Sequence, residues 1–227
     1  MATLTRAFVD AAAAGKAPAQ EAAALLQACA QAAAWRRQGH HDLRMAVNVS
    51  VLQILRGDLP ALLQEVLASA GVPAERIELE VTESMVMANA EQTTAVLHRI
   101  KALGVSLAID DFGTGYSSLV YLKRLPIDTL KIDKEFIGDI TTDPDDEAIT
   151  ATVITMAHSL GLNVVAEGVE TVEQLNYLRE QGCDEIQGFW LSPPLDVQHC
   201  LAFIRGYRPG MELGRSAPDL LTALPPI

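Results

Sequence analysis

Hydrophobic positions along the chain follow two alternating spacings. Short runs rich in β-branched residues are each followed by a longer segment in which apolar residues recur every three or four positions. The short runs predict strands, and the periodic segments predict helices. The predicted strands are 45–51, 77–81, 105–109, 129–132, 163–166 and a short one at 185–187. The chain therefore reads as a series of βα units.

The predicted helices have recognisable ends. Asp143-Pro144 opens one helix, and Thr171-Val172-Glu173-Gln174 opens another with a capping-box pattern. Four helical segments end in a glycine that leads towards a strand, namely Gly71, Gly104, Gly161 and Gly182. Their unequal intervals exclude a solenoid of fixed period. Repeated βα units predict a parallel sheet, either doubly wound or closed as a (β/α)8 barrel with six of eight strands visible.

The two ends of the chain lack this alternation. Residues 1–38 are rich in alanine and have helical periodicity, with Leu25, Cys29 and Ala33 on one face. Residues 206–227 contain several prolines and no periodicity, which is typical of a mobile tail. We therefore expect one domain over 1–205, made of a helical segment (1–38) and the βα series (39–205), followed by a C-terminal tail (206–227).

Charge and composition narrow the possible functions. The formal net charge is -12 and aromatic residues make up 5% of the chain, which disfavours direct binding of nucleic acid. No uncharged apolar run reaches the roughly 18 residues of a membrane-spanning helix, and Asp10 interrupts any signal-peptide core. We expect a cytoplasmic protein without a membrane segment. The three cysteines show no metal-binding spacing, so we expect inert thiols.

Polar residues gather where the predicted strands end. In parallel βα proteins this edge carries the reactive groups. Carboxylates and amides crowded at one edge require a cation, and oxygen donors favour Mg²⁺ or Mn²⁺ over zinc. The adjacent Asp110 and Asp111 are suited to bridging two such ions for attack on a phosphodiester. The polar residues at the strand ends are Asn48, Ser50, Glu80, Thr82, Glu83, Asp110, Asp111, Lys131, Asp133, Glu167, Glu170 and Gln187.

Other interpretations of these residues remain open at this point. Lys131 either holds an attacking water or a phosphate oxygen, or forms a structural ion pair with Glu167. Asp111-Phe112-Gly113 matches the metal-binding triplet of protein kinases, but the other kinase motifs are absent from the sequence. The small residues from Gly113 to Ser118 do not form a dinucleotide fingerprint and predict a mobile loop over the site.

Several ordered motifs together resemble EAL domains, the bacterial phosphodiesterases that open cyclic di-GMP to linear pGpG. The resemblance covers roughly residues 20–205 and implies a modified (β/α)8 barrel. The motifs are Asn48-Val49-Ser50, Glu78-Leu79-Glu80-Val81-Thr82-Glu83-Ser84, Asp110-Asp111-Phe112-Gly113-Thr114-Gly115-Tyr116-Ser117-Ser118, Leu130-Lys131-Ile132-Asp133, Ala166-Glu167-Gly168-Val169-Glu170-Thr171 and Gln187-Gly188-Phe189.

The resemblance also implies a role for individual residues around two Mg²⁺ or Mn²⁺ ions. The first ion would be held by Asn48, Glu80 and Asp110, and the second by Asp110, Asp111 and Glu167. Lys131 would orient the hydrolytic water, with Glu170 and Gln187 supporting the site. Asp133, Gly168 and Phe189 would contact the substrate. Glu83 would anchor the loop 112–118, which in the family couples the active site to dimerisation.

The Glu-Ala-Leu segment of the family should precede the helix around Trp35, and it is missing here. Glu21-Ala22-Ala23-Ala24-Leu25 has a similar composition but lies within a helical pattern. We therefore expect an N-terminally truncated or degenerate member, with a weakened first metal site and reduced or lost hydrolysis. The alternative is a non-catalytic sensor of cyclic di-GMP or a protein-interaction module. A homodimer would form through the loop after Asp111 or through an exposed barrel edge.

Overall fold

A computed structural model describes residues 6–8, 18–113 and 119–207 of the chain. The chain divides into two compact units. The N-terminal unit is Thr5–Thr129, and the C-terminal unit is Leu130–Ile227 together with Met1–Leu4. The expected loop over 114–118 and the expected tail from residue 208 onwards lie outside the described residues.

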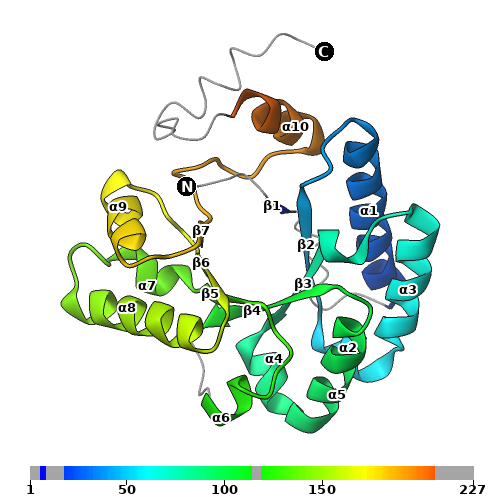
Figure 1. Cartoon of the computed structure of the whole chain (residues 1–227), viewed down its shortest axis with the longest axis horizontal. Coiled ribbons are helices and arrows are strands. Elements are labelled where there is room, and N and C mark those ends of the chain that lie inside the picture. The colour runs from blue at the N-terminus through cyan, green and yellow to red at the C-terminus, as the bar shows by residue number, and fades with distance from the viewer. Residues whose placement is uncertain (1–5, 9–17, 114–118, 208–227) are drawn as a thin grey trace. The chain divides into compact units, whose positions relative to one another are not determined.

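The N-terminal unit is a parallel sheet whose strands are joined by helices (Figure 1). The strands stand in the order β1, β2, β3, β4, and each strand pairs in parallel with the next. The elements are β1 Arg6–Phe8, α1 Pro18–Arg37, β2 Arg44–Asn48, α2 Val51–Arg56, α3 Leu59–Ala70, η1 Ala74–Arg76, β3 Ile77–Thr82, α4 Glu83–Ala88, α5 Ala90–Lys101, β4 Ser106–Phe112 and α6 Leu119–Leu122.

The N-terminal segment differs from the prediction. Residues Arg6–Phe8 form β1, which pairs in parallel with β2 so that Arg6 lies opposite Arg44. Residues 6–8 are thus a strand within the segment that was expected to be helical, and β1 adds a short strand to the six that the sequence predicted. A strand of three residues is too short to produce an alternating pattern in the sequence, and it is specified by its hydrogen bonds to β2.

The C-terminal unit contains the later βα units. Its strands follow in the order β5, β6, β7, with β6 and β7 parallel. The elements are β5 Thr129–Ile132, which begins at the unit boundary, α7 Lys134–Gly138, α8 Pro144–Ser159, β6 Asn163–Ala166, α9 Val172–Glu180, β7 Glu185–Ile186 and α10 Val197–Gly206. The six strands predicted from the sequence are present with ends within about three residues, and the α/β class is confirmed.

Amphipathic packing explains why these helices form. On α3, Leu63, Val66 and Leu67 recur at three- and four-residue spacing and are all buried. The helix ends at Gly71, whose left-handed backbone (φ 64°) closes the last turn with a hydrogen bond to the carbonyl of Leu67. Figure 1 shows α3 beside α1 on the outer side of β2. None of the described helices is both long enough and apolar enough to cross a lipid bilayer.

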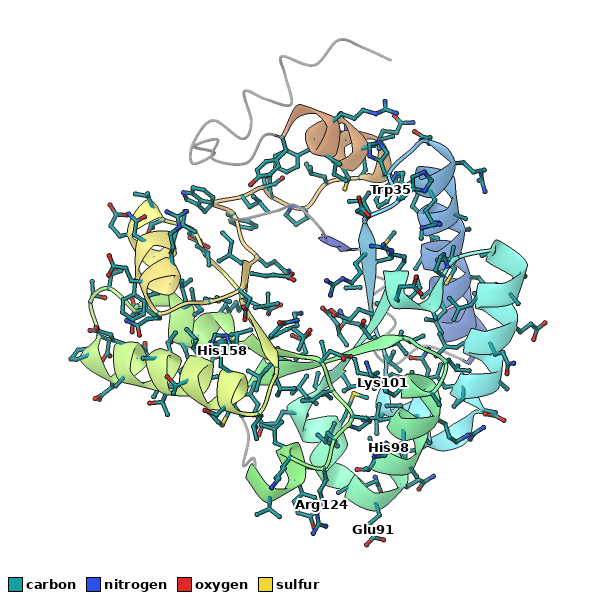
Figure 2. All side chains as sticks on the ribbon, in the orientation of Figure 1. Trp35, Glu91, His98, Lys101, Arg124 and His158 are labelled. Carbon is teal, nitrogen blue, oxygen red and sulfur yellow. The ribbon has the colours of Figure 1, made fainter. Side chains whose placement is uncertain are left out.

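An aspartate directly before β5 fastens α5 to β4. Asp128 accepts a hydrogen bond from the backbone N–H of Leu107 (2.9 Å) and forms an ion pair with Lys101 Nζ (2.6 Å). Lys101 is the last residue of α5 and is labelled in Figure 2. The buried N–H of Leu107 thus gains an acceptor, and the end of the helix is held against the strand that follows it.

In the C-terminal unit a second aspartate likewise contacts both a strand amide and a basic residue at a helix end. Asp184, directly before β7, accepts a hydrogen bond from the backbone N–H of Val164 in β6 (2.8 Å). It also lies 2.9 Å from Nε2 of His158 in the last turn of α8, labelled in Figure 2. In both units a basic residue at a helix end and a strand amide share one aspartate.

Burial disfavours the thiolate form of the cysteines that the structure describes. Burial raises the pKa of Cys29 to about 11 and that of Cys183 to about 12. At about pH 8 the thiolate fraction is then near one in a thousand for Cys29 and lower for Cys183. We expect iodoacetamide to leave both residues unmodified in the folded chain and to modify both in urea, as followed by peptide mass spectrometry. A cysteine introduced at exposed Glu65 serves as the reactive control, and modification of Cys183 at a similar rate would contradict this expectation.

Candidate functional site

Three neighbouring strands of the N-terminal unit place their polar side chains on one face. The register sets Asn48 of β2 opposite Glu80 of β3, and Thr82 of β3 opposite Asp110 of β4. Paired residues of parallel strands share a face, and side chains two positions apart share it too. Asn48, Glu80 and Asp110 therefore lie on the same face near the carboxyl ends of their strands. Glu80 is 2% exposed and Asp110 is 9% exposed.

The backbone is unusual at Asp111. Its φ is 54°, the left-handed region, which no other non-glycine residue among those described adopts. This conformation costs on the order of 1 kcal/mol for an ordinary residue and is least unfavourable for Asp and Asn. Strict alternation would send the side chains of Asp110 and Asp111 to opposite faces, and the left-handed residue breaks that alternation. The adjacent carboxylates stand at the end of β4, as the sequence predicted.

Glu83 connects α4 to the end of β4. Its side chain is buried, and Oε2 accepts a hydrogen bond from the backbone N–H of Gly113 (2.9 Å). Gly113 is the last described residue before the gap at 114–118. Glu83 thus holds the backbone at Gly113, next to the end of β4. A shallow apolar hollow beside Glu83 is lined by Val86, Met87, Ile109, Tyr121, Leu122 and Leu125.

A second buried carboxylate on β3, that of Glu78, lies two residues before Glu80. Glu78 is fully buried, 3.8 Å from Arg44 Nη1 and 3.3 Å from the hydroxyl of Thr129 that donates to it. Since Glu78 and Glu80 are two residues apart, they share one face of the strand, with Glu78 towards its amino end. The sequence places Glu78 within a motif, but its pairing with Arg44 was missed because it depends on two strands lying side by side.

The C-terminal unit provides a buried lysine and a carboxylate in contact. Lys131 of β5 is 2% exposed, and its Nζ lies 2.6 Å from Oε1 of Glu167, which directly follows β6. A buried ammonium is stable only beside compensating charge. The ion pair that the sequence left as an alternative therefore exists, and it places a fixed cation at the strand ends of this unit.

The segment that carries Glu167 is held by backbone hydrogen bonds on two sides. The N–H of Glu167 donates to the carbonyl of Ile132 at the end of β5 (3.1 Å). The N–H of Val169 donates to the carbonyl of Gln187 (3.0 Å), and the N–H of Trp190 donates to the carbonyl of Val169 (2.8 Å). The segment is thus fixed between the chain after β5 and the chain after β7.

Two glycines allow this close packing. Gly168 has φ 71°, and a Cβ there would overlap the side chain of Lys134. Gly188 has φ 156°, and a Cβ there would overlap backbone atoms of Val169. Only glycine fits both requirements. The sequence assigned Gly168 to substrate contact, and the structure shows in addition a packing reason for it.

We expect Gly188→Ala to lower the free energy of unfolding by about 2–4 kcal/mol, because the clash is with backbone that cannot rotate away. Urea denaturation measures the change. Gly138→Ala is the matched control, since a Cβ at Gly138 meets nothing within 4 Å and should change stability by less than about 1 kcal/mol. Equal effects of the two substitutions would contradict this interpretation.

The other predicted site residues occupy different environments. Asp133 is buried and caps α7, because its Oδ1 accepts a hydrogen bond from the N–H of Glu135 (2.7 Å). Gln187 has a buried Oε1 without a hydrogen-bond partner among the described residues. Glu170 is exposed, and the ring of Phe189 is 61% exposed and open to stacking. The structure thus gives Asp133 a structural role in addition to its predicted one.

A model for the EAL domain matches residues 4–194 of the chain. The chain is 47% identical over 184 residues to the cyclic di-GMP phosphodiesterase NbdA of Pseudomonas aeruginosa, a match that covers 81% of this chain and 24% of that protein. The chain thus spans about a quarter of the length of the curated relatives it matches.

Solved structures show the same similarity. The cyclic di-GMP complex of the phosphodiesterase PaMucR superposes with a TM-score of 0.75 at 42% identity, covering 78% of this chain and 71% of that one. Klebsiella pneumoniae BlrP1 with manganese and cyclic di-GMP superposes with a TM-score of 0.69 at 34% identity, covering 78% of this chain and 45% of that one. A further BlrP1 complex contains calcium.

Proposed function

The chain belongs to the EAL-domain family, and on that premise we propose that it hydrolyses cyclic di-GMP to linear pGpG with divalent metal ions, at a rate reduced by a weakened first metal site. The observation that carries this proposal is the register that aligns Asn48 with Glu80 and sets Asp110 on the same face. Few functions other than metal binding explain buried carboxylates gathered on one polar face at the strand ends.

The chemistry of these donors fits Mg²⁺ or Mn²⁺. Carboxylate and amide oxygens without histidine or thiolate are the ligands of hard cations. The first ion would be held by Asn48, Glu80 and Asp110, and the second by Asp110, Asp111 and Glu167. When bound, such a pair of ions lowers the pKa of a water molecule and stabilises charge on phosphoryl oxygens. The calcium and manganese in BlrP1 complexes agree with this class of metal.

The remaining residues position water and substrate in this proposal. Lys131 orients the attacking water or a phosphate oxygen from a position fixed by Glu167. Glu170 and Gln187 support the site, since the Oε1 of Gln187 is buried and available as an acceptor. The exposed ring of Phe189 stacks on a base of the nucleotide, while Asp133 and Gly168 line the same contact.

The test is an assay of the purified chain with cyclic di-GMP and Mn²⁺ or Mg²⁺ that follows linear pGpG. Glu80→Ala is the control, because it removes one proposed ligand. Metal-dependent turnover that the control abolishes supports the proposal. Saturable nucleotide binding without turnover, measured by calorimetry on the same folded sample, assigns a sensor instead. The absence of both activities leaves an interaction module.

We also propose that residues 1–205 form one domain and that the protein acts in the cytoplasm. In this proposal the domain forms a homodimer through the surface that follows Asp111. The described part of this surface carries the exposed side chains of Val120 (62%) and Tyr121 (41%) on α6, and Tyr121 lines the same hollow as Glu83. Light scattering should then give a dimer for the wild-type chain and a monomer for Val120→Asp. A wild-type monomer at micromolar concentration contradicts this assembly, and a dimer that Val120→Asp leaves intact favours pairing through a sheet edge.

A further inference from the structure

Gln174 is a buried side chain whose polar atoms are all used. It is the third residue of α9 and is 5% exposed. Its Oε1 accepts hydrogen bonds from the backbone N–H groups of Glu170 (2.8 Å) and Thr171 (3.0 Å). Its Nε2 donates to the carbonyls of Ile137 (3.0 Å) and Gly138 (2.9 Å) at the end of α7. One amide therefore joins the start of α9 to the end of α7.

Only half of this arrangement serves to cap a helix. A capping box needs an acceptor for the amide at its N-cap, and the bond from Thr171 fulfils that function. The two donations to α7 add nothing to the cap of α9. They satisfy carbonyls at the end of another helix, which would otherwise need water. A glutamate would cap α9 equally well, so the choice of glutamine points to the contact with α7.

The bridge made by Gln174 lies at one end of the segment 167–170, which carries residues of the proposed site. β5 bears Lys131, and α7 follows it after one residue, Asp133. β6 leads directly into Glu167. At the other end of the segment, the N–H of Glu170 donates to the Oε1 of Gln174. Gly168 already rests against Lys134 at the start of α7. The segment is therefore held to α7 at both of its ends, and all these residues belong to the C-terminal unit.

We propose that Gln174 is a positioning residue, which fixes Glu167 and Glu170 relative to Lys131 through its bridge to α7. This inference builds on the proposed function and assigns part of the geometry of that site to a side chain outside it. The 2.6 Å contact between Lys131 and Glu167 spans two consecutive strands, and the bridge joins the segments that follow those strands. Supporting groups of this kind typically change metal affinity or activity by about 10–100-fold when removed.

Two variants of Gln174 and one control separate positioning from capping. Gln174→Glu keeps both acceptors, loses both donors and sets a carboxylate against the two carbonyls of α7. Gln174→Met keeps the shape and loses all four hydrogen bonds. Thr171→Val is the control, since it removes the hydrogen bond that the Gln174 N–H donates to Thr171 Oγ1 (3.2 Å) and leaves the bridge intact.

Three measurements give the outcome. Hydrogen exchange at residues 137–139 and 167–171 should become at least about tenfold faster in both Gln174 variants and stay within about twofold in Thr171→Val. Calorimetric titration with Mn²⁺ should show an affinity about tenfold weaker in Gln174→Glu. The kcat for cyclic di-GMP should fall about tenfold with KM nearly unchanged, because the loss concerns geometry in the reaction and not substrate binding.

Unchanged exchange in the folded Gln174→Glu variant overturns the bridge, whatever the activity of the wild-type chain. Faster exchange with unaltered Mn²⁺ affinity and kcat overturns the positioning role and leaves a structural one. A wild-type chain that neither binds Mn²⁺ nor turns over cyclic di-GMP contradicts the proposed function instead, and the exchange experiment still decides the bridge. If Gln174→Met fails to fold, Gln174→Glu alone carries the test.

Discussion

Replacing Lys131 with methionine is expected to lower the turnover of cyclic di-GMP by about a thousandfold. Lys131 is the buried cation in contact with Glu167, and removal of one preorganised group that stabilises developing charge costs about two to three powers of ten. Methionine has a similar length and keeps the packing of β5. Single-turnover kinetics at saturating Mn²⁺ measure the chemical step. Lys131→Arg should retain more activity, because it restores the charge but not the geometry.

Lys101→Met is the matched control for this experiment. Lys101 also pairs with an aspartate at 2.6 Å, but it lies at the end of α5 and is 37% exposed. Its substitution should change turnover by less than about twofold and stability by less than about 1 kcal/mol. If Lys131→Met and Lys101→Met have equally small effects on turnover, the Lys131–Glu167 contact is a structural ion pair, which is the interpretation that the sequence left open.

The second large effect concerns two glutamates on one strand. Glu80→Gln should weaken Mn²⁺ binding by about a hundredfold or more, because it removes the negative charge of a proposed ligand in a buried position. Glu78→Gln should instead lower the free energy of unfolding by about 1–3 kcal/mol, because Arg44 loses its ion-pair partner. Calorimetry with Mn²⁺ and urea denaturation of both variants separate these effects.

This comparison is demanding because the two residues share a strand, a face and a residue type. Glu78 and Glu80 differ mainly in their distance from the carboxyl end of β3, and both are almost fully buried. Loss of Mn²⁺ affinity in Glu78→Gln as large as in Glu80→Gln would place the metal elsewhere or show that the whole strand has moved. A unique loss in Glu80→Gln supports a metal site at the strand ends.

Much of the fold was predictable because each main strand has a strong local signal. β3 is buried at almost every position, so its sequence shows an apolar run that only Glu78 and Glu80 interrupt. The helix ends were predictable from glycine, as Gly71 illustrates. β1 was not predictable, because three residues carry no period and their pairing with Arg44–Asn48 is decided by contact with a distant part of the chain.

The candidate site was also predictable only in part. The polar residues at strand ends could be found because the carboxyl ends of parallel strands share one edge, which makes Asn48 and Glu80 neighbours once both strands are recognised. The bridge of Gln174 to Gly138 could not be found, because its local pattern already had a complete explanation as a helix cap. When one side chain both caps its own helix and contacts a distant helix, the sequence pattern predicts only the cap.

Asp128 and Asp184 make the same two kinds of contact in two different βα segments, which indicates an internal repeat. Lys101 and Asp128 are separated by almost the same number of residues as His158 and Asp184, and a Leu-Gly pair follows each basic residue at the same distance. In this alignment Asp110 of one half corresponds to Glu167 of the other. Two of the proposed metal ligands thus occupy the same place in two copies of one βα unit, and the two copies differ there by a single methylene group.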